Sequence, residues 1–214
     1  MPSQRRKQAV KDDRTAAERV FGAAIWGRED RVSMDTCRFL DNTPDPDGHP
    51  GHRLEGTVIY RGKGGPTQSD YAVVTDAQWR TRTVDVFVRD LNGVNELHLT
   101  ADGEGHWERD GRPLDLPFPC FDVDLAISPS TNTLAIRRLD LAVGESADAA
   151  VIWVQVPSFI AKPAQQTYTR VDRRVYKFGG KYGSYRIDVD DYGVVQDYPG
   201  GGWRALASRS AKKA

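Results

Sequence analysis

The sequence predicts a mainly β, single-domain protein whose strands run antiparallel. Short segments rich in β-branched and aromatic residues recur about every 8–12 residues, with Gly, Pro or Asp between them. Strands do not alternate with long helical segments, which argues against βαβ units. With 214 residues, the chain suits one domain that buries a substantial core.

The beginning of the chain differs from the rest. Residues 12–26 predict a short amphipathic helix, because alanines and Val20 recur at helical spacing. Thr15 followed three residues later by Glu18 is typical of a capping box. We therefore expect residues 1–25 to form a partly helical N-terminal extension.

Strands dominate beyond a turn-rich loop at 41–51, and a basic, disordered tail is expected over 208–214. In the segment 80–89, Val84, Val86 and Val88 are predicted to share one face. The predicted strands are 54–60, 71–75, 80–89, 96–100, 106–109, 149–156, 166–171, 174–178, 184–189, 194–198 and 203–206.

The middle of the chain, residues 121–146, is its most informative part. It places charged side chains among apolar residues that are predicted to lie in the core: Asp122, Asp124, Arg137, Arg138 and Asp140. Buried charges are costly unless they are paired and hydrogen-bonded. Pro129 ends a strand here, and Thr131, Asn132 or Thr133 can cap a short helix over 134–141.

Several motifs carry a resemblance to a known family. They are DVDL at 122–125, SP at 128–129, TNTLAIRRL at 131–139, GES at 144–146, LEGTV at 54–58, WRTRTVDV at 79–86, YTR at 168–170 and DYGVVQDYPG at 191–200. Residues 26–207 thereby resemble the bacterial putative glycolipid-binding family. The resemblance implies a spiral β-roll, similar to lipoprotein-carrier folds, in which a long antiparallel sheet curls as a half-barrel around one helix. It also implies homodimers, which the exposed edges of an unclosed sheet would favour.

The candidate ligand-binding residues combine this charged segment with the W-R-T-R strand and two polar residues of the family motifs. They are Trp79, Arg80, Arg82, Asp122, Asp124, Asn132, Arg137, Arg138 and Tyr168. An Arg side chain holds a carboxylate through two parallel hydrogen bonds, and Trp faces stack on sugar rings. Among the five tryptophans, Trp79 is the preferred candidate because Arg80 and Arg82 follow it.

Three interpretations of the charged residues stay open. They form a buried scaffold that fixes the helix against the sheet, or they line a polar pocket for sugar hydroxyls or a phosphate. In the third interpretation, Asp122 and Asp124 act as the general acid and base of a glycosidase. Neighbouring arginines argue against the last, since they would hold both acids ionised.

Composition excludes several classes of partner. Thirty basic residues balance 30 acidic residues, and zero net charge argues against nucleic acid as a ligand. We expect no transmembrane segment, since no apolar run approaches about 18 residues. Cys37 and Cys120 lie far apart and no secretory signal precedes them, so reduced thiols in a cytoplasmic protein are expected.

No metal or cofactor is expected. His49 and His52 lie near Asp45 and Asp47 in a proline-rich loop, but a metal site needs further ligands in a rigid arrangement. The GKGG segment at 62–65 lacks the context of a phosphate-binding loop.

We therefore expect a non-catalytic protein that binds a glycolipid or another amphiphile. The apolar interior of the sheet would take the lipid, and the Arg/Asp cluster would take the polar head. Two alternatives remain: an enzyme that acts on a sugar-like or phosphorylated metabolite through Asp122 or Asp124, and a structural or interaction protein in which the cluster is scaffold.

Overall fold

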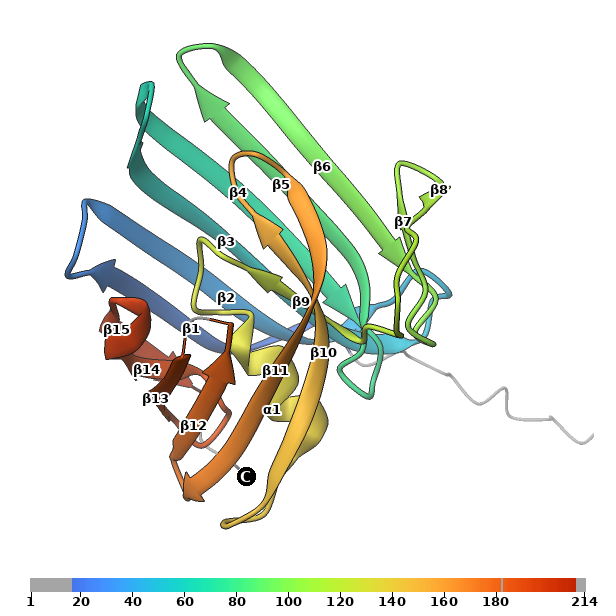
Figure 1. Ribbon diagram of the computed structural model, residues 1–214, viewed down its shortest axis with the longest axis vertical. Coiled ribbons are helices and arrows are strands. Elements are labelled where there is room, and N and C mark those ends of the chain that lie inside the picture. The colour runs from blue at the N-terminus through green and yellow to red at the C-terminus, as the bar shows by residue number, and fades with distance from the viewer. Residues whose placement is uncertain (1–16, 182, 211–214) are drawn as a thin grey trace, which may run out of the picture.

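A computed structural model describes residues 17–181 and 183–210 of the chain. Within them, a single mixed sheet contains 15 strands, and one short α-helix, α1 (Asn132–Leu139), packs against it (Figure 1). A single 3-10 turn, η1 (Pro199–Gly201), connects β14 to β15. The strands are β1 (Arg19–Arg28), β2 (Ser33–Pro44), β3 (Pro50–Gly62), β4 (Gly65–Thr75), β5 (Thr81–Asp90), β6 (Gly93–Ala101), β7 (Trp107–Arg109), β8 (Arg112–Pro113), β9 (Asp122–Leu125), β10 (Ser146–Gln155), β11 (Ile160–Asp172), β12 (Val175–Gly180), β13 (Gly183–Val189), β14 (Val195–Tyr198) and β15 (Trp203–Ser210).

The sheet is a meander in which the first and last strands pair with each other, while two other strands, β8 and β9, form its free edges. Strand order runs β8-β7-β6-β5-β4-β3-β2-β1-β15-β14-β13-β12-β11-β10-β9, so the pairing of β1 with β15 joins the two halves of the chain. The end strands β8 and β9 do not pair with each other, and no closed barrel forms among the described strands. Instead, the backbone N–H of Thr81 donates to Phe121 O at 2.9 Å, which brings the β9 end back to the start of β5.

The sequence predicted a purely antiparallel sheet, but the sheet contains one parallel pair of strands. β9 pairs with β10 in parallel, whereas the other strand pairs are antiparallel. The reason is the intervening helix: a strand–helix–strand crossover returns the chain in its original direction. The helix itself was expected over 134–141 and lies at Asn132–Leu139, where it ends at Asp140 in a left-handed conformation.

The predicted N-terminal helix over 12–26 is wrong for residues 17–26, while residues 12–16 lie outside the described part of the chain. Residues Arg19–Arg28 form β1 instead, because both of its edges find partners in β2 and β15. Phe21, Ala24 and Trp26 point into the core, so long-range pairing and burial override a weak local helix preference.

The turn-rich loop predicted at 41–51 is shorter than expected. β2 continues through Pro44 and β3 begins at Pro50, because the two strands pair up to that point across a bulge at Asn42. Most other predicted strands are confirmed, and many of them extend beyond their predicted ends. The alternation in β5 is also confirmed, since Val84, Val86 and Val88 are all buried.

Two apolar clusters form the core, and α1 contributes residues to both. Leu134 packs into the first cluster, with Trp26, Leu54 and Trp107. Ile136, on another face of the helix, packs into the second cluster with Tyr168 and its neighbours from β10–β14. Figure 1 shows the long strands β2–β6 as one broad layer and α1 among the C-terminal strands. Among the described residues, no helix has the length and apolarity needed to cross a membrane.

Candidate functional site

A cavity of about 530 Å³, called the main cavity below, lies within the curl formed by β9–β15 and the end of β1. Its volume falls in the range of small-molecule sites. Aromatic side chains provide much of its wall: Trp153, Phe178, Tyr185, Tyr198 and Trp203. Such rings present broad apolar faces with polar edges, a combination that suits both sugar rings and alkyl chains.

The polar floor of the main cavity is a chain of hydrogen bonds. Gln166 Nε2 donates to Asp124 Oδ2 at 2.5 Å. Tyr168 OH donates to Asn132 Oδ1 at 3.0 Å and lies 3.4 Å from Gln166 Oε1. Asp124, Asn132 and Gln166 line the cavity, whereas Tyr168 supports them from the core. The floor therefore joins β9, α1 and β11 and holds their polar groups in fixed positions.

Asp124 is the only carboxylate that lines the main cavity within the described residues. Burial raises its pKa to about 6, while the hydrogen bond from Gln166 opposes that shift. No described cation pairs with it, and its Oδ1 has no hydrogen-bond partner among the described residues. An acceptor of this kind, inside a cavity, is suited to a ligand hydroxyl.

A second, smaller cavity of about 210 Å³, called the side cavity below, adjoins the main one. Its own lining is mostly apolar and includes Val58, Tyr60, Ile127 and Val156. The two cavities share five lining residues: Arg28, Arg31, Ala126, Trp153 and Trp203. A larger cavity with aromatic walls and a polar floor thus adjoins a smaller one, and two arginines line both.

Asp122, two residues before Asp124, has a different environment. Arg138 donates from Nε and Nη2 to the Asp122 carboxylate at 2.9 Å and 2.7 Å. The Asp122 side chain is 1% exposed, and burial raises its pKa while the bond with Arg138 opposes the shift. Asp122 and Arg138 therefore satisfy each other and connect α1 to β9. Such a contact fits the interpretation in which these charges form a buried scaffold.

Trp79 and Arg137 meet in a separate place. The Trp79 ring stacks on His52 with 3.8 Å between centroids, and the Arg137 guanidinium lies 5.1 Å from the Trp79 ring. Trp79 is 5% exposed and packs against Phe21 in the core. The structure does not bring this pair to the main cavity.

Arg80 and Arg82 lie at a third place, where Arg80 contacts the connection between β6 and β7 and Arg82 contacts the loop between β2 and β3. Arg80 donates to Gly103 O at 3.0 Å. Arg82 donates from Nη1 to Asp45 at 3.2 Å and from Nη2 to Asp47 at 2.8 Å. Neither arginine lines the main cavity.

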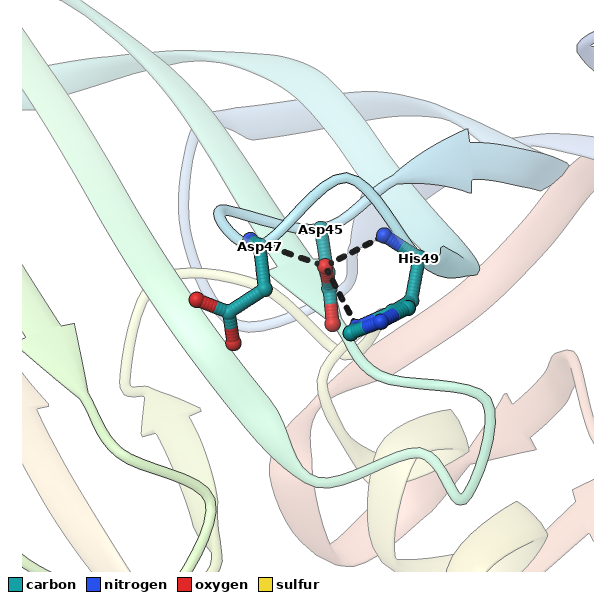
Figure 2. Close-up of side chains that lie close together, drawn as sticks. All are labelled: Asp45, Asp47 and His49. Carbon is teal, nitrogen blue, oxygen red and sulfur yellow. Dashed lines mark hydrogen bonds and ion pairs between the residues drawn. The ribbon is translucent and has the colours of Figure 1, made fainter.

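The same loop contains three potential metal ligands: Asp45, Asp47 and His49 (Figure 2). Asp45 Oδ1, however, accepts the backbone N–H groups of Asp47 and His49, each at 2.9 Å, and so shapes the turn. Arg82 binds both carboxylates and lowers the pKa of Asp47. The loop is therefore organised around a guanidinium.

The predicted site residues thus separate into four groups, of which only Asp124, Asn132 and Tyr168 belong to the main cavity or its floor. Sequence reasoning missed Gln166, Arg28 and Arg31, and it did not rank Trp153 or Trp203 above the other tryptophans. A signal for Gln166 did exist: it shares a strand face with Tyr168, so a buried amide in β11 was readable from the alternation.

Comparisons with known proteins agree with this architecture. A DUF1089 family protein from Pseudomonas aeruginosa, known from its crystal structure, is 34% identical to the chain with a TM-score of 0.68, over 78% of this chain and 89% of that one. A β-barrel-like DUF1849 protein from Brucella abortus is 10% identical, with a TM-score of 0.51 over 90% and 98% of the two chains, a likeness of fold alone. Among curated proteins, no relative matches the chain.

The family model described as putative glycolipid-binding matches residues 23–204. That range includes the cavity-lining strands and nearly the whole sheet. The chain therefore belongs to this putative glycolipid-binding family.

Proposed function

We propose that the protein binds an amphiphile with a hydroxylated, sugar-like head, and that it does so without catalysis. The observation that carries this proposal is the pairing of the two cavities. The main cavity offers the Asp124 carboxylate, amide groups and aromatic walls, and the side cavity offers apolar walls. The head would occupy the first and an alkyl chain would enter the second.

The energetics favour such a ligand. Each methylene moved from water into an apolar site contributes about 0.8 kcal/mol, and a few methylenes offset part of the association cost. Hydroxyl groups of the head would donate to Asp124 Oδ1, which is otherwise unpaired among the described residues. Family membership supports the same ligand class.

The enzymatic alternative through Asp122 and Asp124 has less support. A glycosidase needs two carboxyl groups on opposite sides of one bond. Asp124 lines the main cavity, but Asp122 is held by Arg138 and does not line it. The scaffold alternative suits Asp122 and Arg138 but leaves the main cavity and its floor without a role.

Titration with a neutral sugar detergent, dodecyl maltoside, below its micelle concentration tests the proposal, with heat or tryptophan fluorescence as the readout. We expect saturable binding that maltose alone does not reproduce. Asp124→Ala should weaken it by about tenfold, the effect of losing one charge-assisted hydrogen bond. Asp148→Ala is the matched control, because Asp148 lies on the neighbouring strand β10 and bonds Thr167 outside the cavity.

Two results would refute the proposal. One is that folded wild-type protein binds no detergent and releases no lipid on extraction. The other is that Asp124→Ala and Asp148→Ala bind with the same affinity as the wild type.

A further inference from the structure

The junction of the two cavities carries an organised pair of arginines. Arg28 donates from Nε and Nη2 to the two oxygens of Asp30 at 2.6 Å and 2.7 Å. Arg31 donates from Nε and Nη2 to Oδ2 of the same carboxylate at 3.1 Å and 3.0 Å. Two guanidinium groups thus share one carboxylate, which leaves a local excess of positive charge. In keeping with this, the arginines hold the pKa of Asp30 well below its usual range, the bond from Arg28 contributing most.

Arg28 is fixed more firmly than a surface arginine. Its side chain is 12% exposed, and its guanidinium lies 4.9 Å from the centre of the Trp203 ring. Gly202, at φ +75°, allows this approach: a Cβ there would lie 2.9 Å from Asp30 Oδ1 and 3.0 Å from Arg28 Nη2. Nη1 of Arg28 has no hydrogen-bond partner among the described residues. A planar cation is therefore held in place with one nitrogen available to a ligand.

The rest of the cavity lining adds to the positive charge. Lys162 and Lys181 also line the main cavity, whose single acidic side chain among the described residues is Asp124. Asp124 belongs to the floor of hydrogen bonds with Gln166, whereas Arg28 and Arg31 lie where the main cavity meets the side cavity. The carboxylate acceptor and the two arginines are thus contributed by different parts of the site.

We infer that the ligand is an anionic amphiphile whose phosphate, sulfate or carboxylate group binds at Arg28 and Arg31, between its hydroxylated head and its alkyl chain. This inference rests on the proposed function and narrows it. Arginine pairs bind such groups through parallel hydrogen bonds, and their partial burial strengthens the attraction. A neutral glycolipid would leave the shared cation pair without a partner from the ligand.

Three probes separate the possibilities: lysophosphatidylinositol, which has an anionic polyol head and one chain; dodecyl maltoside, which is neutral; and inositol 1-phosphate, which has no chain. Wild-type protein should bind lysophosphatidylinositol at least tenfold more tightly than either of the other two. The preference over maltoside should shrink as salt rises, because screening weakens ionic contacts.

Arg31→Gln and Arg28→Gln should each weaken binding of lysophosphatidylinositol by about tenfold and weaken binding of dodecyl maltoside several-fold less. Arg31 is the safer variant, since its side chain is 65% exposed and its loss disturbs little packing. Arg204→Gln is the matched control: Arg204 pairs with Glu29 in the same region and lines neither cavity. It should change neither affinity.

Equal wild-type affinity for the anionic and neutral detergents, or an equal effect of Arg31→Gln on both, would overturn the inference. If maltoside still binds in an Asp124-dependent way, the proposed function survives that failure. Inositol 1-phosphate binding as tightly as the lipid would also overturn it, in favour of a soluble phosphorylated sugar. Absence of binding by both detergents would refute the inference and the proposed function together.

Discussion

Asp35 accepts a 2.5 Å hydrogen bond from Ser128 Oγ, and this contact joins β2 to the loop between β9 and α1. Tyr71 OH, from β4, lies 3.3 Å from both Asp35 oxygens, 3.0 Å from Ser128 Oγ and 2.9 Å from Ser130 Oγ. Asp35 is fully buried, and no described cation pairs with it. Because Ser128 also lines the main cavity, this cluster connects the N-terminal strands to the site.

The first prediction concerns pH and Asp35. Burial raises the pKa of this carboxyl to about 7, although bonds from Ser128 and Tyr71 oppose the shift. Between about pH 4 and pH 7 the folded state therefore binds more protons than the unfolded state, so stability falls as pH rises through that window. Asp35→Asn should remove this loss and be more stable than the wild type by about 2–4 kcal/mol at pH 8.

Urea unfolding of both proteins at pH 5 and pH 8 measures the difference. Asp124→Asn serves as the comparison, because the pH range over which ionisation of Asp124 lowers stability should end lower, near pH 6. A difference between Asp35→Asn and the wild type that is the same at both pH values would contradict the account.

The second prediction concerns the glycine of the LEGTV motif. Gly56 pairs directly with Tyr71 across β3 and β4, and a Cβ on Gly56 would lie 2.4 Å from Tyr71 OH and 2.5 Å from Thr36 O. Gly56→Ala should therefore cost about 2–4 kcal/mol, since both the ring and a backbone carbonyl must move. In Gly179→Ala, the added carbon meets ordinary contacts of 3.6 Å or more, so its melting temperature should change much less. Equal losses in the two variants would refute this reading.

The third prediction concerns the buried ion pair of Asp122 and Arg138. Arg138→Met would leave a carboxylate unpaired beside the core, and it should lower the free energy of unfolding by about 3–5 kcal/mol. Adding Asp122→Asn should recover a large part of that loss, because the unpaired charge is removed. A double-mutant cycle by denaturant unfolding measures the coupling, and strictly additive losses would contradict a direct pair.

The fourth prediction concerns the pH dependence of binding. Asp124, whose pKa burial raises to about 6, accepts ligand hydroxyls better when it is ionised. Affinity for the neutral dodecyl maltoside should rise from pH 5 to pH 7.5, and in Asp124→Asn it should be flat. Calorimetric titrations at the two pH values provide the comparison, and a rise that persists in the variant would assign the effect to another group.

Alternation along single strands was readable from the sequence. Val84, Val86 and Val88 share a buried face, as period 2 predicts, and most strand cores were located within a few residues. The sequence-based predictions failed where the structure of a segment depends on a strand or helix that is distant in the sequence. β1 is a strand because β2 and β15 flank it, and β9 is parallel to β10 because α1 intervenes. Neither relation is encoded in local composition.

The site was less predictable for a similar reason. Asp122 and Asp124 lie two residues apart and were treated as one cluster, yet Arg138 holds the first while the second faces Gln166 in the cavity. Arg28 ends β1 and Arg31 lies in the connection to β2, where the sequence carries no motif, and only the pairing of β1 with β15 brings Arg28 to Trp203. The contact between Arg28 and Trp203 therefore depends on strand order, which local sequence does not reveal.

A crystal structure of the protein with lysophosphatidylinositol, supplied near its dissociation constant in solution, tests the central claim most directly. The account predicts polyol hydroxyls within hydrogen-bond distance of Asp124, the phosphate on Arg28 and Arg31, and the alkyl chain beside Val58, Tyr60 and Val156. A ligand bound outside both cavities, or cavities that stay closed to it while it binds elsewhere on the sheet, would contradict the account.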